Sequence, residues 1–225
     1  METELLEDAL ELNALKELPR TWQKREALGV EVLWVEATLE EYFYLLEKID
    51  YRIEYYRGKI FSFMDQASIT HETLVIYLGY LFTHDYLNLA DFQILSSNIK
   101  IFSEQCTASF NADLSVVKGD IEFLTLPSGK KSKATLTNPY IIVEILSEST
   151  QGLDFGEKLS CYKTITSLQQ IVFIDQASVY ISSYTRNNKP NEWINQDYRS
   201  ITETLKLIDF DLKIEEIYRK VKDLK

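Results

Sequence analysis

The stretch NPYIIVEILSESTQGLDFGEKLSCYK, residues 138–163, predicts a buried strand, a Ser/Thr-rich turn and a helix. Its apolar part, Tyr140–Leu146, carries one carboxylate, Glu144, in its middle. A buried carboxylate without a partner costs several kcal/mol or takes up a proton. We therefore expect a partner that holds Glu144, and the helix that follows offers Lys158 close to its beginning.

A second carboxylate precedes this strand. Side chains alternate along a strand, so Glu144 shares one face with Ile142 and Leu146. Asp113 lies near the start of the preceding predicted strand, FNADLSVV (110–117). If the two strands are neighbours, both carboxylates lie within a few ångströms of each other and repel. A divalent cation removes this conflict, and hard oxygen ligands favour Mg²⁺ or Mn²⁺.

Lys158 completes the set of residues that carries chemistry. It lies one turn into the helix that follows Glu144, near the end of the strand. Two acids, a metal ion and a lysine can hydrolyse a phosphodiester, because the metal activates water and the ammonium stabilises developing charge. Taken singly, each acid has a structural alternative: Glu144 can form an ion pair, and Asp113 can be a turn residue at a strand end.

The composition is that of a globular protein. The chain has 225 residues, of which 45% are hydrophobic and 26% charged, and no apolar run approaches the length of a membrane span. The acidic start METELLEDALEL is unlike a secretory signal, so the cytoplasm is the expected location. Cys106 and Cys161 lie far apart and form neither a disulfide framework nor a metal pattern.

The net charge of −11 belongs largely to the N-terminal segment. Residues 1–50 contain 13 acids and 5 bases, a balance of −8 that leaves −3 for the remaining residues. The main domain is thus close to neutral, which neither supports nor excludes a nucleic-acid partner. We predict an acidic helical extension over residues 1–30 and one domain over 31–225.

Hydrophobic periodicity predicts an α/β fold with a central mixed sheet. The core order is helix, strand, strand, strand, helix, strand. The expected elements are a helix over 4–18, a strand over 32–37, a helix from a Thr38–Glu41 capping box to about Lys48, a hairpin over 51–64 turning at Arg57-Gly58, a long helix capped by Thr70, strands over 92–102 and 110–117, a loop containing SGKKSK (128–133), the strand Tyr140–Leu146, a helix capped by Asp154 with Glu157, strands over 171–175 and 178–185, and a terminal helix.

From about Thr38 to Val221 the chain resembles the Uma-two family of restriction endonuclease-like proteins, within the PD-(D/E)XK nuclease superfamily. The residues that carry the resemblance are TLEEYFYL, YRIEYYRGKI, His71 at a helix start, the Asp113 strand, NPYIIVEILSEST with the following D..GEK...Y, and VFID. The resemblance implies a restriction-endonuclease-like core and a metal-dependent DNA endonuclease in which Asp113 and Glu144 bind Mg²⁺ or Mn²⁺.

The chain departs from the superfamily pattern at three positions. The usual lysine two residues after the glutamate is Leu146 here, and the resemblance implies that Lys158 substitutes for it. Ala112 replaces the usual proline before the first aspartate, and Glu148 replaces a proline near the expected site. None of these changes removes a proposed ligand.

Four further residues are candidates for the site. The backbone carbonyl of Ile145 is a candidate metal ligand, and Glu54, His71 and Tyr162 are candidate outer residues. The structural alternative is a strand-face charge for Glu54, a helix-start residue for His71 and core packing for Tyr162.

Two functions follow from these residues. The first is a Mg²⁺-dependent DNA endonuclease, expected to be a homodimer because cutting both strands with one site per chain requires two subunits. The alternative is a catalytically inactive nuclease-fold binding module. The chain contains no G-x-S-x-G elbow, no phosphate-binding glycine loop and too few Cys and His for a zinc site.

Overall fold

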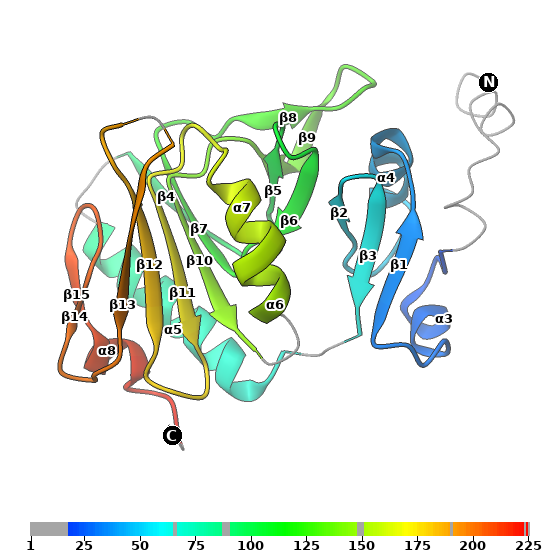
Figure 1. Ribbon diagram of the computed structural model, residues 1–225. Coiled ribbons are helices and arrows are strands. Elements are labelled where there is room, and N and C mark those ends of the chain that lie inside the picture. The colour runs from blue at the N-terminus through cyan, green and yellow to red at the C-terminus, as the bar shows by residue number, and fades with distance from the viewer. Residues whose placement is uncertain are drawn as a thin grey trace, which may run out of the picture.

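Two large mixed sheets form the protein (Figure 1). The computed structural model describes residues 18–64, 67–86, 91–147, 151–189, 191–222 and 224. Sheet A has the strand order β1-β3-β2-β6-β5-β9-β8, and sheet B has the order β13-β12-β11-β10-β7-β4. The sequence predicted one central mixed sheet; the mixed α+β class is confirmed, with two sheets in place of one.

The bounds of the elements are as follows. The strands are β1 Val32–Glu36, β2 Glu54–Tyr56, β3 Lys59–Phe63, β4 Phe92–Ser96, β5 Lys100–Ser103, β6 Ala108–Asn111, β7 Leu114–Lys118, β8 Phe123–Thr125, β9 Lys131–Leu136, β10 Ile141–Leu146, β11 Gln170–Asp175, β12 Ile181–Arg186, β13 Trp193–Tyr198, β14 Thr204–Lys206 and β15 Asp211–Lys213. The helices are α3 Trp22–Glu26, α4 Leu39–Leu46, α5 Ile69–Tyr86, α6 Gln151–Leu153, the π-helical turn η1 Asp154–Lys158, α7 Leu159–Tyr162 and α8 Ile214–Tyr218.

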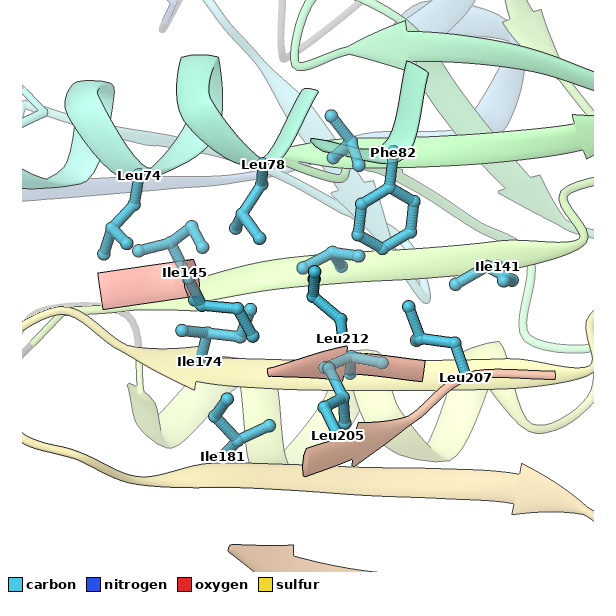
Figure 2. Close-up of a cluster of buried hydrophobic side chains, with 14 of the residues drawn as sticks. Leu74, Leu78, Phe82, Ile141, Ile145, Ile174, Ile181, Leu205, Leu207 and Leu212 are labelled. Carbon is cyan, nitrogen blue, oxygen red and sulfur yellow. The ribbon is translucent and has the colours of Figure 1, made fainter. Parts of the chain in front are cut away.

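Strand β10 is buried on both faces. The alternation of its side chains decides which residues pack on each face. Ile141 and Ile145 point toward α5, whose Leu74, Leu78 and Phe82 are almost fully buried against sheet B (Figure 2). Burying each of these large side chains contributes about 1.5–3 kcal/mol. The alternation predicted from the sequence is therefore confirmed, and it directs Glu144 away from α5.

The opposite face of β10 meets the helical segment 151–162, which lies between the two sheets. Ile142 and Leu146 pack there with Leu159 and Tyr162 of this segment and with Phe110 of sheet A. The disulfide between Cys106 and Cys161 ties the β5–β6 turn of sheet A to α7, with Cα atoms 5.6 Å apart. The prediction that these two cysteines form no disulfide framework is thus wrong, because separation along the chain does not limit distance in the fold.

Two predicted strands break in the middle and change sheets. The predicted strand 92–102 is β4 in sheet B followed by β5 in sheet A, and the predicted strand 110–117 is β6 in sheet A followed by β7 in sheet B. Antiparallel pairing of β4 with β7 and of β5 with β6 makes one bent hairpin that belongs to both sheets. Asp113 lies at the second break, so the bend sets its position.

Several predicted elements are confirmed. Thr38 and Glu41 form the capping box of α4, and β2 and β3 turn at Arg57 and Gly58, which have φ angles of 44° and 84° as a type I′ hairpin requires. β1, β10, β11, β12 and α8 also lie where the sequence predicts strands and a terminal helix.

Three predicted boundaries are wrong. Helix α5 begins at Ile69, because the Ser68 side chain, and not Thr70, accepts a hydrogen bond from the first turn. The predicted loop around 128–133 enters strand β9 at Lys131. The helical segment 151–162 begins at Gln151, whose N–H bonds the Ser147 carbonyl, so Asp154 lies inside it and is no cap.

Most of the predicted N-terminal extension lies outside the described residues. The predicted helix over 4–18 falls almost entirely there, and within 18–30 the structure contains the short helix α3, capped by Thr21. The domain boundary near residue 30 stays a prediction. In the described ranges, every helix is too short or too polar to span a membrane.

Candidate active site

A cavity of about 390 Å³ opens between the two sheets, where β10 ends. Its wall contains five carboxylate side chains and, among the described lining residues, only two permanent cations. The carboxylates are Glu54, Glu72, Asp113, Glu144 and Asp154, and the cations are Arg52 and Lys158. The cavity therefore carries excess negative charge.

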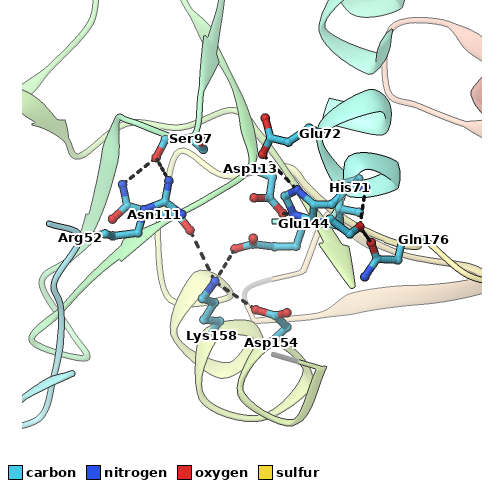
Figure 3. Close-up of polar contacts among 12 residues, drawn as sticks. Arg52, His71, Glu72, Ser97, Asn111, Asp113, Glu144, Asp154, Lys158 and Gln176 are labelled. Carbon is cyan, nitrogen blue, oxygen red and sulfur yellow. Dashed lines mark hydrogen bonds and ion pairs between the residues drawn. The ribbon is translucent and has the colours of Figure 1, made fainter. Parts of the chain in front are cut away.

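Glu144 is held by groups from the helical segment between the sheets. Its Oε1 lies 3.2 Å from Lys158 Nζ (Figure 3). The same oxygen accepts a hydrogen bond from the Tyr162 hydroxyl at 2.6 Å. These contacts give the buried carboxylate of β10 the partners that its place in an apolar strand requires. Burial nonetheless raises the pKa of Glu144 well above its usual value, although the Lys158 ammonium opposes this.

Lys158 is an ammonium ion clamped between acids. It is 6% exposed, and its Nζ lies 3.0 Å from Asp154 Oδ1 in addition to the Glu144 contact. Burial alone would lower the pKa of Lys158, but Asp154 and Glu144 outweigh this and hold it well above its usual value. A lysine in this state stays charged at neutral pH and cannot act as a general base.

Asp113 lies one residue before β7, where the chain crosses from sheet A to sheet B. Since Val143 of β10 pairs with Leu114, Asp113 falls opposite Glu144 at the next position of the register. Its Oδ2 accepts a hydrogen bond from the backbone N–H of Ile145 at 2.7 Å and lies 3.2 Å from His71 Nε2. Burial would raise the pKa of Asp113, but these contacts with His71 and Ile145 lower it below its usual value.

His71 comes from the first turn of α5 and contacts Asp113, one residue before β7. Burial acts to lower the pKa of His71, and the Asp113 carboxylate overcomes this and raises it. The raised pKa of His71 favours a charge-assisted pair between His71 and Asp113.

Sheet A contributes Glu54 to the opposite wall. Glu54 pairs with Phe61 across β2 and β3, and its Oε1 accepts a hydrogen bond from the backbone N–H of Asn111 at 3.1 Å. Its Oε2 is buried and has no hydrogen-bond partner among the described residues. A buried carboxylate oxygen in that condition is costly unless a cation or donor reaches it.

Three residues at the site were missed by sequence reasoning. Asp154, expected to cap a helix, instead contacts Lys158 four positions later on the same segment, and that i,i+4 spacing was the available signal. The Asn111 carbonyl lies 3.5 Å from Lys158 Nζ, and its side-chain Oδ1 accepts from Lys100 at 2.6 Å. Burial lowers the pKa of Lys100 to about 8.

The candidates named from the sequence are thus brought together. Asp113, Glu144, Ile145, Lys158, Glu54 and His71 all line the cavity, and Tyr162 lies behind Glu144 with its hydroxyl on the carboxylate. Figure 3 shows Lys158 between Glu144 and Asp154, with Asp113 and His71 on the side of α5. Their roles in binding and chemistry remain predictions.

A hard divalent cation fits the chemistry of these donors. Asp113 and Glu144 face one cavity from adjoining strands, and their contacts in the described part of the chain use only Oδ2 and Oε1, respectively. Glu54 adds a buried oxygen without a partner. No three His, Cys, Asp or Glu side chains of the described residues are gathered closely enough to form a complete metal site. Carboxylate oxygens and excess negative charge are what Mg²⁺ and Mn²⁺ prefer.

Comparison with known proteins connects this geometry to a family. Residues 39–215 match the family Uma2, whose description is "Putative restriction endonuclease". This range contains every described residue that lines the cavity except Trp22. The match therefore covers sheet B, every strand of sheet A except β1, and the segment between the sheets.

Two proteins of Synechocystis sp. are similar to the chain along much of its length. The uncharacterized protein slr1290 is 29% identical over 181 residues, which are 80% of this chain and 90% of that protein. The uncharacterized protein sll1609 is 28% identical over 151 residues, which are 66% of this chain and 80% of that protein.

The fold also has a counterpart among solved structures. A crystal structure from Anabaena variabilis, described as "a putative nuclease belonging to DUF820", superposes with a TM-score of 0.63 at 16% sequence identity. The superposition covers 81% of this chain and 97% of that one. At this identity the likeness shows the fold. Together with the family match, it supports a nuclease, a hydrolase that acts on nucleic acid.

Proposed function

Because the chain belongs to the Uma2 family, we propose that it is a divalent-metal-dependent endonuclease that hydrolyses phosphodiester bonds of DNA. The observation that supports this most directly is the meeting of Asp113, Glu144 and Lys158 in one acidic cavity between the sheets. Separate structural roles for the two acids would not require them to face the same cavity.

In this proposal, Asp113 and Glu144 hold the cation, with the Ile145 carbonyl as a further ligand. A bound Mg²⁺ or Mn²⁺ would lower the pKa of its water and offset the charge of the phosphate. Lys158 supplies a permanent positive charge that stabilises the anionic transition state or orients the attacking water. Its contacts with Glu144 and Asp154 fix the ammonium in place before substrate arrives.

The outer residues hold the ligands in position. The Tyr162 hydroxyl fixes one oxygen of Glu144, and His71 with the Ile145 N–H fixes one oxygen of Asp113. Each contact reduces the motion of a carboxylate and so reduces the cost of ordering it on metal binding. Glu54 faces the same cavity from sheet A and would add negative charge beside the cation.

Plasmid cleavage tests the proposal. Purified wild-type protein with Mg²⁺ or Mn²⁺ is expected to cut supercoiled DNA and to be inactive in EDTA. Asp113→Asn, Glu144→Gln and Lys158→Met should each lower the cleavage rate by at least about 100-fold, as removal of groups that stabilise transition-state charge does. The control is Glu157→Gln, which removes an exposed carboxylate next to Lys158 and should leave the rate unchanged.

The product of the same reaction reports subunit number. A homodimer with two sites converts circles to linear DNA in one encounter, whereas a monomer with one site accumulates nicked circles. We expect linear product. Activity that is equal in the wild type and all three site variants would contradict the assignment. A folded protein that binds Mn²⁺ yet cuts no nucleic acid would instead support the nuclease-fold binding module.

A further inference from the structure

A row of aromatic side chains leads from the edge of sheet A to the acids of the site. Trp34 of the edge strand β1 pairs directly with Phe61 of β3, and Phe61 pairs with Glu54 of β2, so all three lie on one face of the sheet. Trp34 stacks on Phe61 with ring centroids 4.7 Å apart, and Phe63, two residues along β3, contacts Phe61 edge-on at 5.8 Å. Phe61 and Phe63 line the cavity, as Trp22 does from α3.

Trp34 is half exposed although it is large and apolar. Its exposed fraction is 46%, and its stacked neighbour Phe61 is fully buried, so the indole presents an open ring at the outer end of the row. Two inter-strand spacings, roughly 10 Å, separate the positions of Trp34 and Glu54 across the sheet. About three nucleotides span that length at the 3.4 Å rise of a stacked strand.

The charges of the cavity argue against recognition of a duplex through its phosphates. Proteins that bind duplex DNA this way make about 6–10 phosphate contacts with Lys and Arg. Among the described lining residues only Arg52 and Lys158 are permanent cations, and Lys158 is already paired with two carboxylates. Inside the cavity, affinity therefore needs a source other than cation–phosphate pairs, and stacking of bases on aromatic side chains needs little charge.

The depth of the site also favours an unpaired strand over a duplex. Glu144 and Lys158 are 2% and 6% exposed, so a phosphate has to enter the cavity to reach them. The cavity volume of about 390 Å³ is in the range of sites for small ligands. In a paired duplex the faces of the bases are covered by their neighbours, and only an unpaired base can offer a face to Trp34.

We infer that the site takes a locally unpaired DNA strand, of the kind that supercoiled plasmid exposes. A base stacks on the exposed ring of Trp34, which is backed by the buried Phe61, while the strand's backbone passes Arg52 and enters the cavity. The inference rests on the proposed function and names the form of DNA that the site takes. Arg52 lies on the Ser97 side of the cavity, with its guanidinium on the Ser97 carbonyl at 3.3 Å, and is the cation available to an adjacent phosphate (Figure 3).

Binding measured without cleavage tests this inference. Fluorescence anisotropy with the full chain in Ca²⁺ and in EDTA would compare a labelled 12-nucleotide thymidine strand with a labelled duplex of the same length. We expect the single strand to bind at least about tenfold more tightly. For the single strand, the slope of log K against log salt should be no steeper than about −2, whereas 6–10 duplex phosphates give about −5 to −9.

Matched variants locate the contact. Trp34→Ala and Trp34→Leu should each weaken single-strand binding at least about fivefold, since loss of one stacked base costs that much. Tyr80→Ala is the control, because Tyr80 is a 60% exposed aromatic residue on α5. Circular dichroism would confirm that all variants are folded.

Three results would overturn the inference: tighter binding of the duplex, equal affinity of the Trp34 and Tyr80 variants, or loss of self-association by Trp34→Ala without loss of strand affinity. The failure of the proposed function is separate. Cleavage of fully paired DNA without single-strand binding would keep the nuclease and reject the aromatic platform. Binding that depends on Trp34 without any cleavage would keep the aromatic platform and reject the nuclease.

Discussion

The acids of the site are partnered one by one, although the cavity as a whole stays acidic. Lys158 faces Glu144 and Asp154, Asp113 faces His71, and Glu54 keeps one buried oxygen, Oε2, without a hydrogen-bond partner among the described residues. Removing one partner of a buried ion pair costs about 3–5 kcal/mol because the other charge is left buried. The same clamps that order the site thus also stabilise the fold.

The raised pKa of Glu144 predicts how metal affinity depends on pH. Cation binding requires the ionised carboxylate, and burial favours its protonated form, so binding releases a proton and strengthens as pH rises through the raised pKa. The pKa of His71 is also raised, so His71 loses its proton, and with it the charge that pairs with Asp113, as the pH rises. The apparent Kd for Mn²⁺ should fall by up to about tenfold per pH unit for each proton released.

Calorimetric titration with Mn²⁺ at several pH values, in buffers of different ionisation enthalpy, would measure both the affinity and the proton count. Glu157→Gln is the control, because it removes an exposed carboxylate that does not line the cavity and should keep the pH dependence. A Kd that does not change with pH, with no proton released, would show that Glu144 is ionised before the metal arrives.

At the residue scale, much of the site could be predicted. Glu144 was identified because a charge inside an apolar strand needs a partner, and Lys158 because it follows at the start of the next segment. The contact of Asp154 with Lys158 was not predicted, because an aspartate near a helix start is typical of a cap. The observed start at Gln151 places Asp154 inside the helical segment. Asn111 and Lys100 act through a backbone carbonyl and a buried amine, which residue type alone does not reveal.

At the scale of elements, the bent hairpin made by β4–β5 and β6–β7 matters most. Periodicity predicts that 92–102 and 110–117 are extended, which they are, but it contains no signal that each strand changes sheets. Whether a strand continues or bends depends on what packs against each half, and those partners come from distant parts of the chain. The bend is also what brings Asp113 opposite Glu144.

Local capping, by contrast, was predictable and gives a stability test. Thr38 Oγ1 accepts from the Glu41 N–H at 3.1 Å, and the Glu41 carboxylate accepts from the Thr38 N–H at 2.5 Å. Thr38→Ala removes one bond of this box and should lower the free energy of unfolding by about 1 kcal/mol. Urea denaturation of the variant would measure the change.

The control for that measurement is Thr83→Ala on α5. The Thr83 hydroxyl bonds a carbonyl of its own helix, Gly79 O, a contact that contributes little to helix stability. Its unfolding free energy should stay within about 0.5 kcal/mol of the wild type. Equal destabilisation by both variants would mean that the capping box of α4 is not formed in solution.

For the whole molecule, the packing of sheet A against α7 and sheet B decides whether a site exists. The disulfide between Cys106 and Cys161 spans a separation of 55 residues and fastens sheet A to the segment that carries Lys158. Disulfides are rare in cytoplasmic proteins, and the cytoplasmic location expected from the sequence stays a prediction.

Reduction of this bond should destabilise the protein measurably. Closing a loop of this length contributes up to about 4 kcal/mol by the chain-entropy relation. Urea unfolding with and without dithiothreitol would compare the two states of the wild type, and Cys106→Ser should resemble the reduced protein and be insensitive to dithiothreitol. A wild-type midpoint unaffected by dithiothreitol would show that the thiols are not joined under those conditions.

The distribution of the site along the chain has a consequence for protein synthesis. Glu54, Asp113, Glu144 and Lys158 come from both sheets and from the segment between them, and these meet only through non-local contacts. Such contacts form late in folding. In the proposed mechanism Lys158 is required for cleavage, so a nascent chain that has not yet emerged past residue 158 would not cut the nucleic acid around it. Activity would then begin only after the segment that carries Lys158 has been translated and has packed between the sheets.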